Sequence, residues 1–283
     1  MNTLSKTLAI LDLYAAERMV WTAEEMAEEL GYTRPTTYRY IRELVAAGFI
    51  VRFGDGSYSL GPRSVELDFL IRQADPFLVA GVPVVRDLSQ QTGADMNLYE
   101  LYGDRIVTVH QQGGVGALPI SFGRGRPLPL LRGAGSKVIV AQLPRARLQR
   151  ISEAHVDDAR DYLGASDFNA FRASLNAIRK VGYAISEGEL DRGFKGIAVP
   201  VFTADERVLG CIATVLTPQR FELTRIDSLV DLLKLGAARL SAGMAALRPS
   251  HTDQHAYTAS SPTIRPARPP LRRTNSRATP KSR

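Results

Sequence analysis

The apolar positions at the start of the chain recur at helical spacing and predict a first helix over residues 4–17. Further along, Thr22 precedes Glu25 by three residues, which is the spacing of a capping box at the start of a second helix. Gly31 follows the last apolar residue of that segment and marks its predicted end. The beginning of the chain is therefore expected to be helical.

A third helix and a hairpin complete this first unit. Thr33 is a suitable N-cap and Pro35 fits a first helical turn, so the third helix is predicted from about residue 34 to residue 47. Two predicted strands, 49–53 and 57–60, flank a Gly-Asp-Gly turn, which is a strong hairpin signal. Three helices with a tight turn before the third, followed by a hairpin, are typical of a winged helix-turn-helix.

The exposed face of the third helix carries the candidate DNA-binding residues. Helical spacing places Thr37, Ile41 and Leu44 on its buried face. The positions that remain exposed combine guanidinium and hydroxyl groups, and they are Arg34, Thr36, Tyr38, Arg39 and Arg42. Hydroxyl groups suit phosphate oxygens, and arginine also forms paired hydrogen bonds with guanine edges in the major groove.

Charge segregation supports this interpretation of the third helix. Four glutamates gather on the second helix while the third is basic, which favours contact with DNA through one face. The alternative is an ordinary three-helix domain whose arginines only solvate its surface. Tyr38 and Tyr40 also suit internal positions, so the pattern leaves their placement open.

Helical and strand patterns alternate through residues 62–247. An apolar-periodic segment over residues 62–74 predicts a linker helix, which Asp75-Pro76 ends. Further helices are predicted at residues 79–91, 134–142, 145–153, 167–181 and 221–247. Strands are predicted at residues 96–101, 105–111, 183–187, 196–202 and 208–215. This order predicts a mixed α+β domain whose helices cover a sheet, and such domains commonly hold small ligands.

The net positive charge of the chain comes from its last residues. The 283 residues carry a formal net charge of +7, and residues 248–283 alone hold eight basic residues and one acidic residue. The rest of the chain therefore has as many acidic as basic residues. The net positive charge of the whole chain does not by itself indicate that the folded part binds nucleic acid. Residues 248–283 are rich in Pro, Ser, Thr and Arg, which predicts disorder. They are either a solvated appendage or a polycation with salt-sensitive affinity for DNA phosphates.

Cysteine and histidine usage excludes several kinds of site. The single cysteine, Cys211, excludes a disulfide framework and any site built from several cysteines, and it suggests a reducing compartment. The four histidines show no metal-ligand spacing in the part predicted to fold, so no metal and no cofactor are expected. No apolar run approaches the roughly 18 residues that cross a bilayer, and the N-terminus lacks a signal-peptide core. We therefore expect a cytoplasmic protein without a membrane partner.

No catalytic residue is predicted either. The segment 133–138 lacks the Gly-Lys-Ser/Thr order that a phosphate-binding loop requires. A hydrolase needs a nucleophile with a histidine base, and neither His110 nor His155 lies near a nucleophile-elbow pattern. Cys211 falls within an apolar strand, where a buried core position is the simpler interpretation. Three acidic residues between two predicted strands are interpreted as an ordinary charged loop: Glu187, Glu189 and Asp191.

Several segments carry a resemblance that covers roughly residues 4–245. In the N-terminal part these are residues 22–27, 36–44, 48–50 and 58–61, and in the C-terminal part residues 182–186 and 193–202, the last reading Gly-Phe-Lys-Gly-Ile-Ala-Val-Pro-Val-Phe. The first set fits several winged-helix families, but both sets in this order and spacing are specific. The chain resembles the IclR (isocitrate lyase regulator) family of bacterial transcription factors.

The resemblance implies a DNA-binding repressor or activator that responds to a small organic acid. It implies a winged helix-turn-helix over residues 1–61, a linker helix over 62–75 and a GAF-like α+β effector domain over 76–247, and it leaves the predicted disordered tail over 248–283 outside the resemblance. It also implies a homodimer or a dimer of dimers that associates through the N-terminal domains and the linker helix. Double-stranded operator DNA is the implied macromolecular partner.

The resemblance further implies an effector pocket built from three places. These are a loop entering a helix, whose backbone amides suit a carboxylate, a strand pair and the last strand. The implied effector-binding residues are Gly133, Ala134, Ser186, Phe194, Gly196, Ala213 and Val215. The alternative is that these positions belong to the ordinary core.

The chain departs from the family pattern in this pocket. An acidic residue is common where Ser186 stands, cysteine where Gly196 stands, and histidine where Leu131 stands, and hydroxyl-bearing side chains are common where Ala213 and Val215 stand. Most of these changes remove polar groups, and glycine in place of cysteine frees volume. We therefore expect a larger, more apolar pocket than one for a two- or three-carbon keto acid. The hypothesis is an effector that is an aromatic or otherwise bulky carboxylate.

Two classes of function follow from the sequence. The first is a ligand-responsive transcription regulator. The second is a ligand-sensing enzyme or scaffold that uses the helix-turn-helix only for dimerisation. Arg39 and Arg42 separate the two, because only the first requires them to contact DNA.

Overall fold

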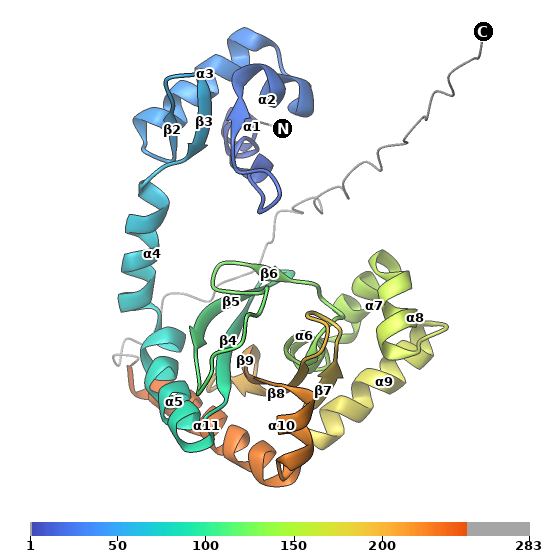
Figure 1. The fold of residues 1–283 in the computed structure, drawn as a ribbon. Coiled ribbons are helices and arrows are strands. Elements are labelled where there is room, and N and C mark those ends of the chain that lie inside the picture. Colours follow the sequence, from blue (N-terminus) through green and yellow to red (C-terminus); the bar gives the residue numbers. More distant parts are fainter. Residues whose placement is uncertain (1, 248–283) are drawn as a thin grey trace, which may run out of the picture.

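The computed structural model describes residues 2–247 and shows two bodies joined by one helix, α4 (Figure 1). The predicted disordered tail, residues 248–283, lies outside the described residues. The helices of the first body are α1 (Thr3–Leu8), a 3-10 turn (Leu11–Leu13), α2 (Ala23–Leu30) and α3 (Arg34–Ala46). Its strands are β1 (Trp21–Thr22), β2 (Ile50–Arg52) and β3 (Ser57–Leu60), and they form an antiparallel sheet in the order β1-β3-β2.

The predicted start and end of α2 are confirmed. The Thr22 Oγ1 atom accepts a hydrogen bond from the Glu25 backbone nitrogen at 3.3 Å, and Glu25 Oε2 accepts one from the Thr22 backbone nitrogen at 2.8 Å. This reciprocal pair is a capping box and satisfies two amide groups that have no partner within the helix. Gly31 then adopts a left-handed conformation with φ 67°, which ends α2 and begins the turn to α3.

The prediction of a single helix over residues 4–17 is wrong. α1 ends at Leu8, and both of its leucines are exposed, whereas Ile10 beyond it is fully buried. The chain leaves the helical path because Trp21, in the unpredicted strand β1, pairs with Tyr58 of β3. A short bend paired between Ala15 and Arg18 brings the chain back to that strand. Sheet pairing here outweighs local helix propensity.

Helix α3 packs one face into the core of the first body. Thr37, Ile41 and Leu44 are buried, as predicted. Tyr40 is also buried, while Tyr38 is 47% exposed, so the two tyrosines whose placement the sequence left open lie on opposite sides of the helix surface. The basic side chains of α3 are therefore directed away from the core.

The linker helix continues into the second body through a sharp break. α4 spans Arg63–Ala74 and α5 spans Pro76–Thr92. Asp75, between them, is extended, and its Oδ1 atom accepts a hydrogen bond from the Phe77 backbone nitrogen at 2.8 Å. The break follows from Pro76, which disfavours helical conformation at the residue before it and suits the first turn of the next helix.

The second body is built on a six-stranded antiparallel sheet. Its strands are β4 (Asp95–Tyr102), β5 (Arg105–Gln112), β6 (Pro127–Leu128), β7 (Ala184–Glu187), β8 (Lys195–Phe202) and β9 (Val208–Leu216). They are arranged in the order β6-β5-β4-β9-β8-β7. Every neighbouring pair is antiparallel, and β6 is a strand that the sequence did not predict.

Helices cover both faces of this sheet (Figure 1). α5 and α11 pack on one face around Leu98, Val199 and Ile212, and α6 and α9 pack on the other around Tyr99, Ala198 and Cys211. The remaining helices are α6 (Ala134–Val140), α7 (Arg145–Ala154), α8 (Val156–Leu163), α9 (Phe168–Val181), α10 (Pro218–Leu223) and α11 (Ile226–Leu247).

Two helix predictions in this body need correction. The segment 156–163 forms α8, a helix that was not predicted from the sequence. The predicted closing helix 221–247 is two helices, because the chain is extended at Thr224 between α10 and α11. The predicted fold class is confirmed: a winged helix-turn-helix, a linker helix and an α+β domain. Within residues 2–247, no helix is both long and apolar enough to cross a membrane.

Candidate DNA and effector sites

The outer face of α3 presents three arginines to solvent. Arg34, Arg39 and Arg42 are all exposed, and the Arg42 side chain is 76% exposed. The Arg39 guanidinium lies 5.2 Å from the centre of the Tyr40 ring, a distance at which the cation is attracted to the ring. Arg42 lies 3.6 Å from Glu43 Oε1, an exposed ion pair that a bound anion would compete with. Arginine suits both phosphates and guanine edges.

A surface groove connects α3 with the hairpin. Tyr38, Arg39 and Arg42 line it from the helix, and Arg52 lines it from β2. Arg52 is not among the DNA-binding residues predicted from the sequence, although a basic residue just before the hairpin turn is an available signal. The groove therefore has basic groups on both sides, from the recognition helix and from the wing.

The other predicted DNA-binding residues have partners within the protein. The Thr36 hydroxyl accepts a hydrogen bond from the Thr33 hydroxyl at 2.9 Å, so Thr33 is the N-cap residue without capping a backbone amide. The Tyr38 hydroxyl donates to Glu24 Oε1 of α2 at 3.1 Å, which raises the pKa of Tyr38. The second of these contacts joins α2 and α3 at the same surface that presents the arginines.

The register of the sheet gathers the implied effector-binding residues of the strands. Ser186 of β7 lies opposite Gly196 of β8, and Gly196 lies opposite Val215 of β9. Ala213, two residues before Val215, lies opposite Ala198. Ala198 and Ala213 pack in the cluster that contains α6, so this row of small residues faces α6.

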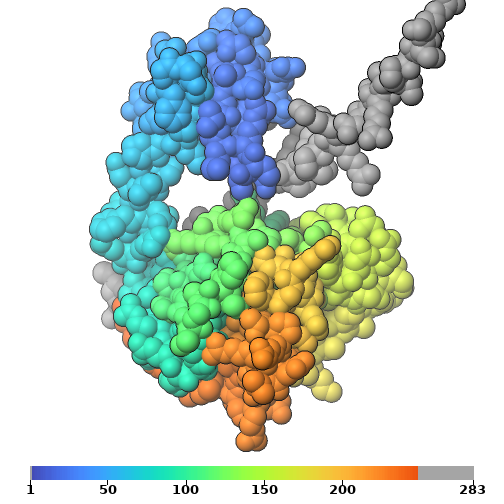
Figure 2. Space-filling view, viewed as in Figure 1, coloured from blue at the N-terminus to red at the C-terminus, as the bar shows by residue number. Residues whose placement is uncertain are grey.

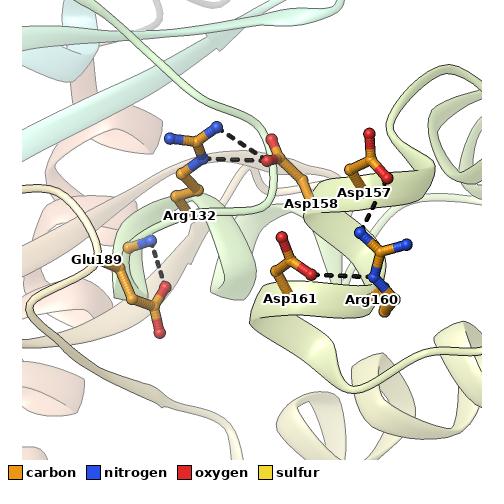
Figure 3. A network of polar contacts seen from close by, with 7 residues as sticks. Arg132, Asp157, Asp158, Arg160, Asp161 and Glu189 are labelled. Atoms are coloured by element: carbon orange, nitrogen blue, oxygen red, sulfur yellow. Dashed lines mark hydrogen bonds and ion pairs between the residues drawn. The ribbon is translucent and has the colours of Figure 1, made fainter.

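The start of α6 is held by side chains from the loop after β7 and from β7 itself. The Gly133 backbone nitrogen donates to Glu189 Oε2 at 2.8 Å (Figure 3), and the Ala134 backbone nitrogen donates to Ser186 Oγ at 3.0 Å. Lys137 Nζ lies 2.5 Å from the other oxygen of Glu189. A carboxylate of the chain thus occupies the place where the resemblance implied a bound carboxylate.

Lys137 and Glu189 form a buried ion pair that sequence reasoning missed. Their side chains are only 7% and 14% exposed. The interpretation of Glu189 as part of an ordinary charged loop is therefore wrong, because its carboxylate faces inward. The alternation of acidic residues at Glu187, Glu189 and Asp191 was the only signal in the sequence.

The same loop fills the space beside the site. A Cβ atom added at Gly133, where φ is 83°, would lie 2.6 Å from the Leu190 side chain. A Cβ atom added at Gly196 would lie 2.9 Å from Ser186 Oγ, so the volume expected from glycine at this position is already occupied. Phe194, at the end of the loop, is half-buried. The site is closed by residues of the chain in this structure.

Arg132 ties the start of α6 to α8. Its guanidinium lies 2.9 Å from Asp158 Oδ1, and Figure 3 shows this pair beside the Glu189 contact. The neighbouring network of Arg160 with Asp157 and Asp161 lies on the exposed surface of α8. The first pair positions the site, whereas the second belongs to the surface.

A glycine-rich loop, residues 113–126, joins β5 to β6 and contacts both β4 and the loop that carries Glu189. Asp95 accepts hydrogen bonds from the backbone nitrogens of Gly114 at 2.8 Å and Leu118 at 3.1 Å. Asp191, in the loop that carries Glu189, accepts one from the Ser121 backbone nitrogen at 3.0 Å. The two loops are therefore in direct contact.

The glycine-rich loop also contacts the linker helix. Arg124 Nη2 lies 2.5 Å from Asp68 Oδ1 of α4, and Asp68 Oδ2 lies 2.7 Å from Arg72 Nε. Hydrogen bonds from Arg124 and Arg72 lower the pKa of Asp68. Contacts thus run from the Glu189 loop to α4, which leads to the first body along one side of the molecule (Figure 2).

Cys211, the single cysteine of the chain, is a core residue. Cys211 is fully buried, and burial raises the pKa of its thiol well above the ordinary range, which disfavours the reactive thiolate. In the part of the chain that the structure describes, no three His, Cys, Asp or Glu side chains are grouped to hold a metal ion.

Family models match both bodies of the chain. One, described as the bacterial transcriptional regulator IclR C-terminal domain, matches residues 76–242. Another, the IclR helix-turn-helix domain, matches residues 3–53. Together they cover most of the chain on either side of α4.

Similar proteins span almost the same length. The HTH-type transcriptional regulator KdgR of Escherichia coli is 26% identical over 251 residues, covering 86% of this chain and 92% of its own. A crystal structure of a putative IclR transcriptional regulator from a Silicibacter species has a TM-score of 0.74 and 26% identity, covering 88% of this chain and 98% of its own. An IclR homologue from Microbacterium hydrocarbonoxydans, complexed with 4-hydroxybenzoate, has a TM-score of 0.67 and 19% identity, covering 87% and 100%.

Proposed function

We propose, from the premise that this chain belongs to the IclR family of bacterial transcriptional regulators, that a bulky or aromatic carboxylate controls its affinity for operator DNA. The family assignment makes the chain a DNA-binding regulator with an effector domain rather than an enzyme. The alternative of a ligand-sensing enzyme or scaffold is thereby set aside. The effector class, the contacting residues and the oligomer are the parts proposed here.

The observation that carries the effector class is the buried pair of Lys137 and Glu189. A buried ammonium group needs an anionic partner, since removing one member of a buried pair leaves an uncompensated charge. Glu189 supplies this partner from a loop, together with an acceptor for the Gly133 backbone nitrogen. An effector carboxylate would make the same two contacts once the loop moves away.

The proposal of a bulky effector is based on the space that would open if the loop carrying Glu189 moved away. Glu189 and Leu190 cover Gly133, and Phe194 lies half-buried beyond them. Moving these side chains would expose the apolar row that includes Ala213 and Val215. The homologue complexed with 4-hydroxybenzoate shows that this fold can hold an aromatic acid. Volume would therefore come from displacement of the loop rather than from Gly196.

The proposed DNA contacts lie on α3 and the wing. Arg39 and Arg42 are proposed to reach base edges in the major groove, and Arg52 to bind a phosphate. Arg34, Thr36 and Tyr38 are proposed to contact the DNA backbone near the start of the helix. Their exposed or half-buried positions on one surface support this assignment.

A homodimer or a dimer of dimers is proposed from the exposed face of α4. Val65 and Phe69 are 71% and 60% exposed, and Leu70 and Ile71 are also largely exposed. Apolar side chains in such a row favour burial against another helix. A second copy of α4 would cover them and set the spacing of two recognition helices. Sedimentation of the chain and of a Phe69→Lys variant would test this, and a monomeric wild-type chain would contradict it.

The regulatory mechanism follows from linkage between the two sites. An effector changes DNA affinity only if it binds one arrangement of the domains more tightly than the other. The contacts from the Glu189 loop through Ser121 and Arg124 to Asp68 offer a physical route to α4. Displacement of Glu189 would alter the first of these contacts.

Calorimetric titration tests the proposal. We expect 4-hydroxybenzoate or benzoate to bind the full chain, and glyoxylate and pyruvate to bind weakly or not at all. A Glu189→Gln variant should bind the aromatic acid about tenfold more tightly, because a neutral side chain competes less well for Lys137. Glu187→Gln, which alters an exposed carboxylate at the end of β7, is the matched control. Tight binding of glyoxylate or pyruvate without any binding of aromatic acids would refute the proposed effector class.

A further inference from the structure

Asn97 lies in the middle of β4, on the face of the sheet that α6 covers. Its neighbours along the strand, Met96 and Leu98, pack on the opposite face with α5 and α11. Tyr99, two residues further on, packs with α6, and so does Ala213, which lies directly opposite Asn97 on β9. Because side chains alternate along a strand, the Asn97 amide faces the same side as the proposed effector-binding residues.

Neither polar atom of the Asn97 side chain has a hydrogen-bond partner among the described residues, although the side chain is fully buried. An unsatisfied buried polar atom destabilises the folded state, and the amide of Asn97 has two of them. Two other buried polar side chains of this sheet have partners, although His110 Nε2 on β5 also has none among the described residues. Thr108 donates to the Phe122 carbonyl oxygen at 3.0 Å, and Thr214 donates to the Asp95 carbonyl oxygen at 2.9 Å.

On the side towards β9, the residues beside Asn97 are small and uncharged. Across the sheet, the register places Ala213, Ala198 and Ala184 in one row beside it. On α6, which packs over β8 and β9, the buried Ser136 hydroxyl also has no partner among the described residues. Two unsatisfied neutral groups therefore belong to the two layers that enclose the proposed site. Such groups favour an uncharged hydrogen-bonding group over a second charge, because burying a charge costs more.

We infer that Asn97 determines effector specificity by binding a hydroxyl group at the buried end of the molecule. This inference rests on the proposed function and narrows the effector to a hydroxylated bulky acid. The carboxylate pairs with Lys137, and the hydroxyl donates to Asn97 Oδ1 or accepts from Asn97 Nδ2. Asn97 thereby rejects an analogue that lacks the hydroxyl, since that analogue leaves the amide unsatisfied.

The first measurement compares two acids that differ only in the hydroxyl group. The full chain is titrated with 4-hydroxybenzoate and with benzoate, and the hydroxylated acid is expected to bind at least tenfold more tightly. In Asn97→Leu the two dissociation constants should become equal, mainly because the hydroxylated acid loses affinity. Gln111→Leu, which changes an exposed amide opposite Asn97 on β5, should keep the preference. Equal binding of both acids to the wild-type chain, or an unchanged preference in Asn97→Leu, overturns the inference.

The second measurement does not depend on the choice of acid. Without any ligand, Asn97→Leu should unfold at a higher temperature than the wild-type chain, because an apolar side chain of similar size removes two unsatisfied groups. A lower unfolding temperature would show that the amide is satisfied in the free protein, and would overturn the inference. Should Asn97→Leu fail to fold, Asn97→Ala replaces it in the titration.

The two failures can be told apart. If neither acid binds the wild-type chain, the proposed aromatic effector class is wrong, and the unfolding temperature of Asn97→Leu alone decides on Asn97. If both acids bind equally well, the proposed function stands and the assignment of Asn97 is wrong. A preference that disappears in Asn97→Leu and persists in Gln111→Leu supports both.

Discussion

At the scale of single residues, Arg39 and Arg42 provide the most direct test of the DNA-binding face. Both are exposed on α3 and line the groove that includes Arg52. Replacing either with alanine should weaken operator binding by about 1–3 kcal/mol if the lost contact is to a base edge. Fluorescence anisotropy at one fixed salt concentration measures the change. Arg160→Ala, which alters an exposed arginine on α8, should leave affinity unchanged, and an equal loss there would point to a general charge effect.

Glu100 makes the stability of the chain depend on pH. Its side chain is buried on β4, and burial raises its pKa from 4.5 to about 8, partly opposed by the hydrogen bond from the Tyr102 hydroxyl. Between these two values the folded chain holds a proton that the unfolded chain releases. Stability from this group is therefore complete below pH 4.5 and falls as pH rises towards 8, by at most about 1.4 kcal/mol per pH unit.

A Glu100→Gln variant should remove this dependence. Its free energy of unfolding should exceed that of the wild-type chain by a margin that grows from pH 5 to pH 8, as measured by urea denaturation. Glu222→Gln, which changes an exposed carboxylate on α10, is the control. A margin that stays constant with pH would show that Glu100 is already ionised in the folded chain.

Residues on helix faces could be predicted from the sequence, whereas those that meet across the fold could not. Thr37, Ile41 and Leu44 follow from helical periodicity alone. The pairing of Lys137 with Glu189 joins residues 52 positions apart through a loop whose path no local pattern specifies. The sequence also could not show that the buried amide of Asn97 lacks a hydrogen-bond partner, because this depends on residues from several strands and helices. Resemblance supplied the region of the site but not these chemical details.

At the scale of elements, long periodic segments were predictable and short or interrupted ones were not. α9, with an aspartate cap at Asp167 and a left-handed glycine at Gly182, closely follows the predicted helix 167–181. α10 and α11 were predicted as one helix because apolar spacing continues across Thr224. The two-residue strands β1 and β6 exist only through pairing with distant strands, and such pairing leaves no periodic signal.

Helix α4 is the element expected to carry the regulatory signal. In Asp68→Asn, the loss of the ion pairs with Arg124 and Arg72 should leave effector binding and DNA binding each measurable. The factor by which the effector changes DNA affinity should fall several-fold, since couplings between sites are typically about 1–3 kcal/mol. DNA titrations with and without saturating effector measure this factor.

A second substitution on the same helix separates coupling from helix stability. Arg63 and Glu66 form an exposed ion pair 2.8 Å apart in the first turn of α4, at the end next to the first body. Glu66→Gln should therefore preserve the full effector response. An unchanged response in Asp68→Asn would show that the signal reaches α4 by another path, such as its junction with α5 at Asp75.

At the scale of the whole molecule, charge and fold are separated along the chain. The arginines proposed to contact specific bases lie on α3 and β2, while residues 248–283 carry a net charge of +7 and the rest of the chain is balanced. Specific contacts and general attraction to DNA would then come from different parts of the chain. Specific base contacts depend weakly on salt, whereas neutralised phosphates release counterions and make affinity fall steeply with salt.

Deletion of residues 249–283 tests this division of roles. The slope of log affinity against log salt concentration should become shallower by about 0.9 for each phosphate that the segment neutralises. Affinity at low salt should fall, while the preference for operator over random DNA and the response to effector should remain. A full-length variant with Arg265, Arg268, Arg272 and Arg273 changed to glutamine keeps the length and removes charge, so it should reproduce most of the effect. An unchanged slope in both proteins would mean that the segment does not touch DNA, and that the affinity comes from the winged helix-turn-helix alone.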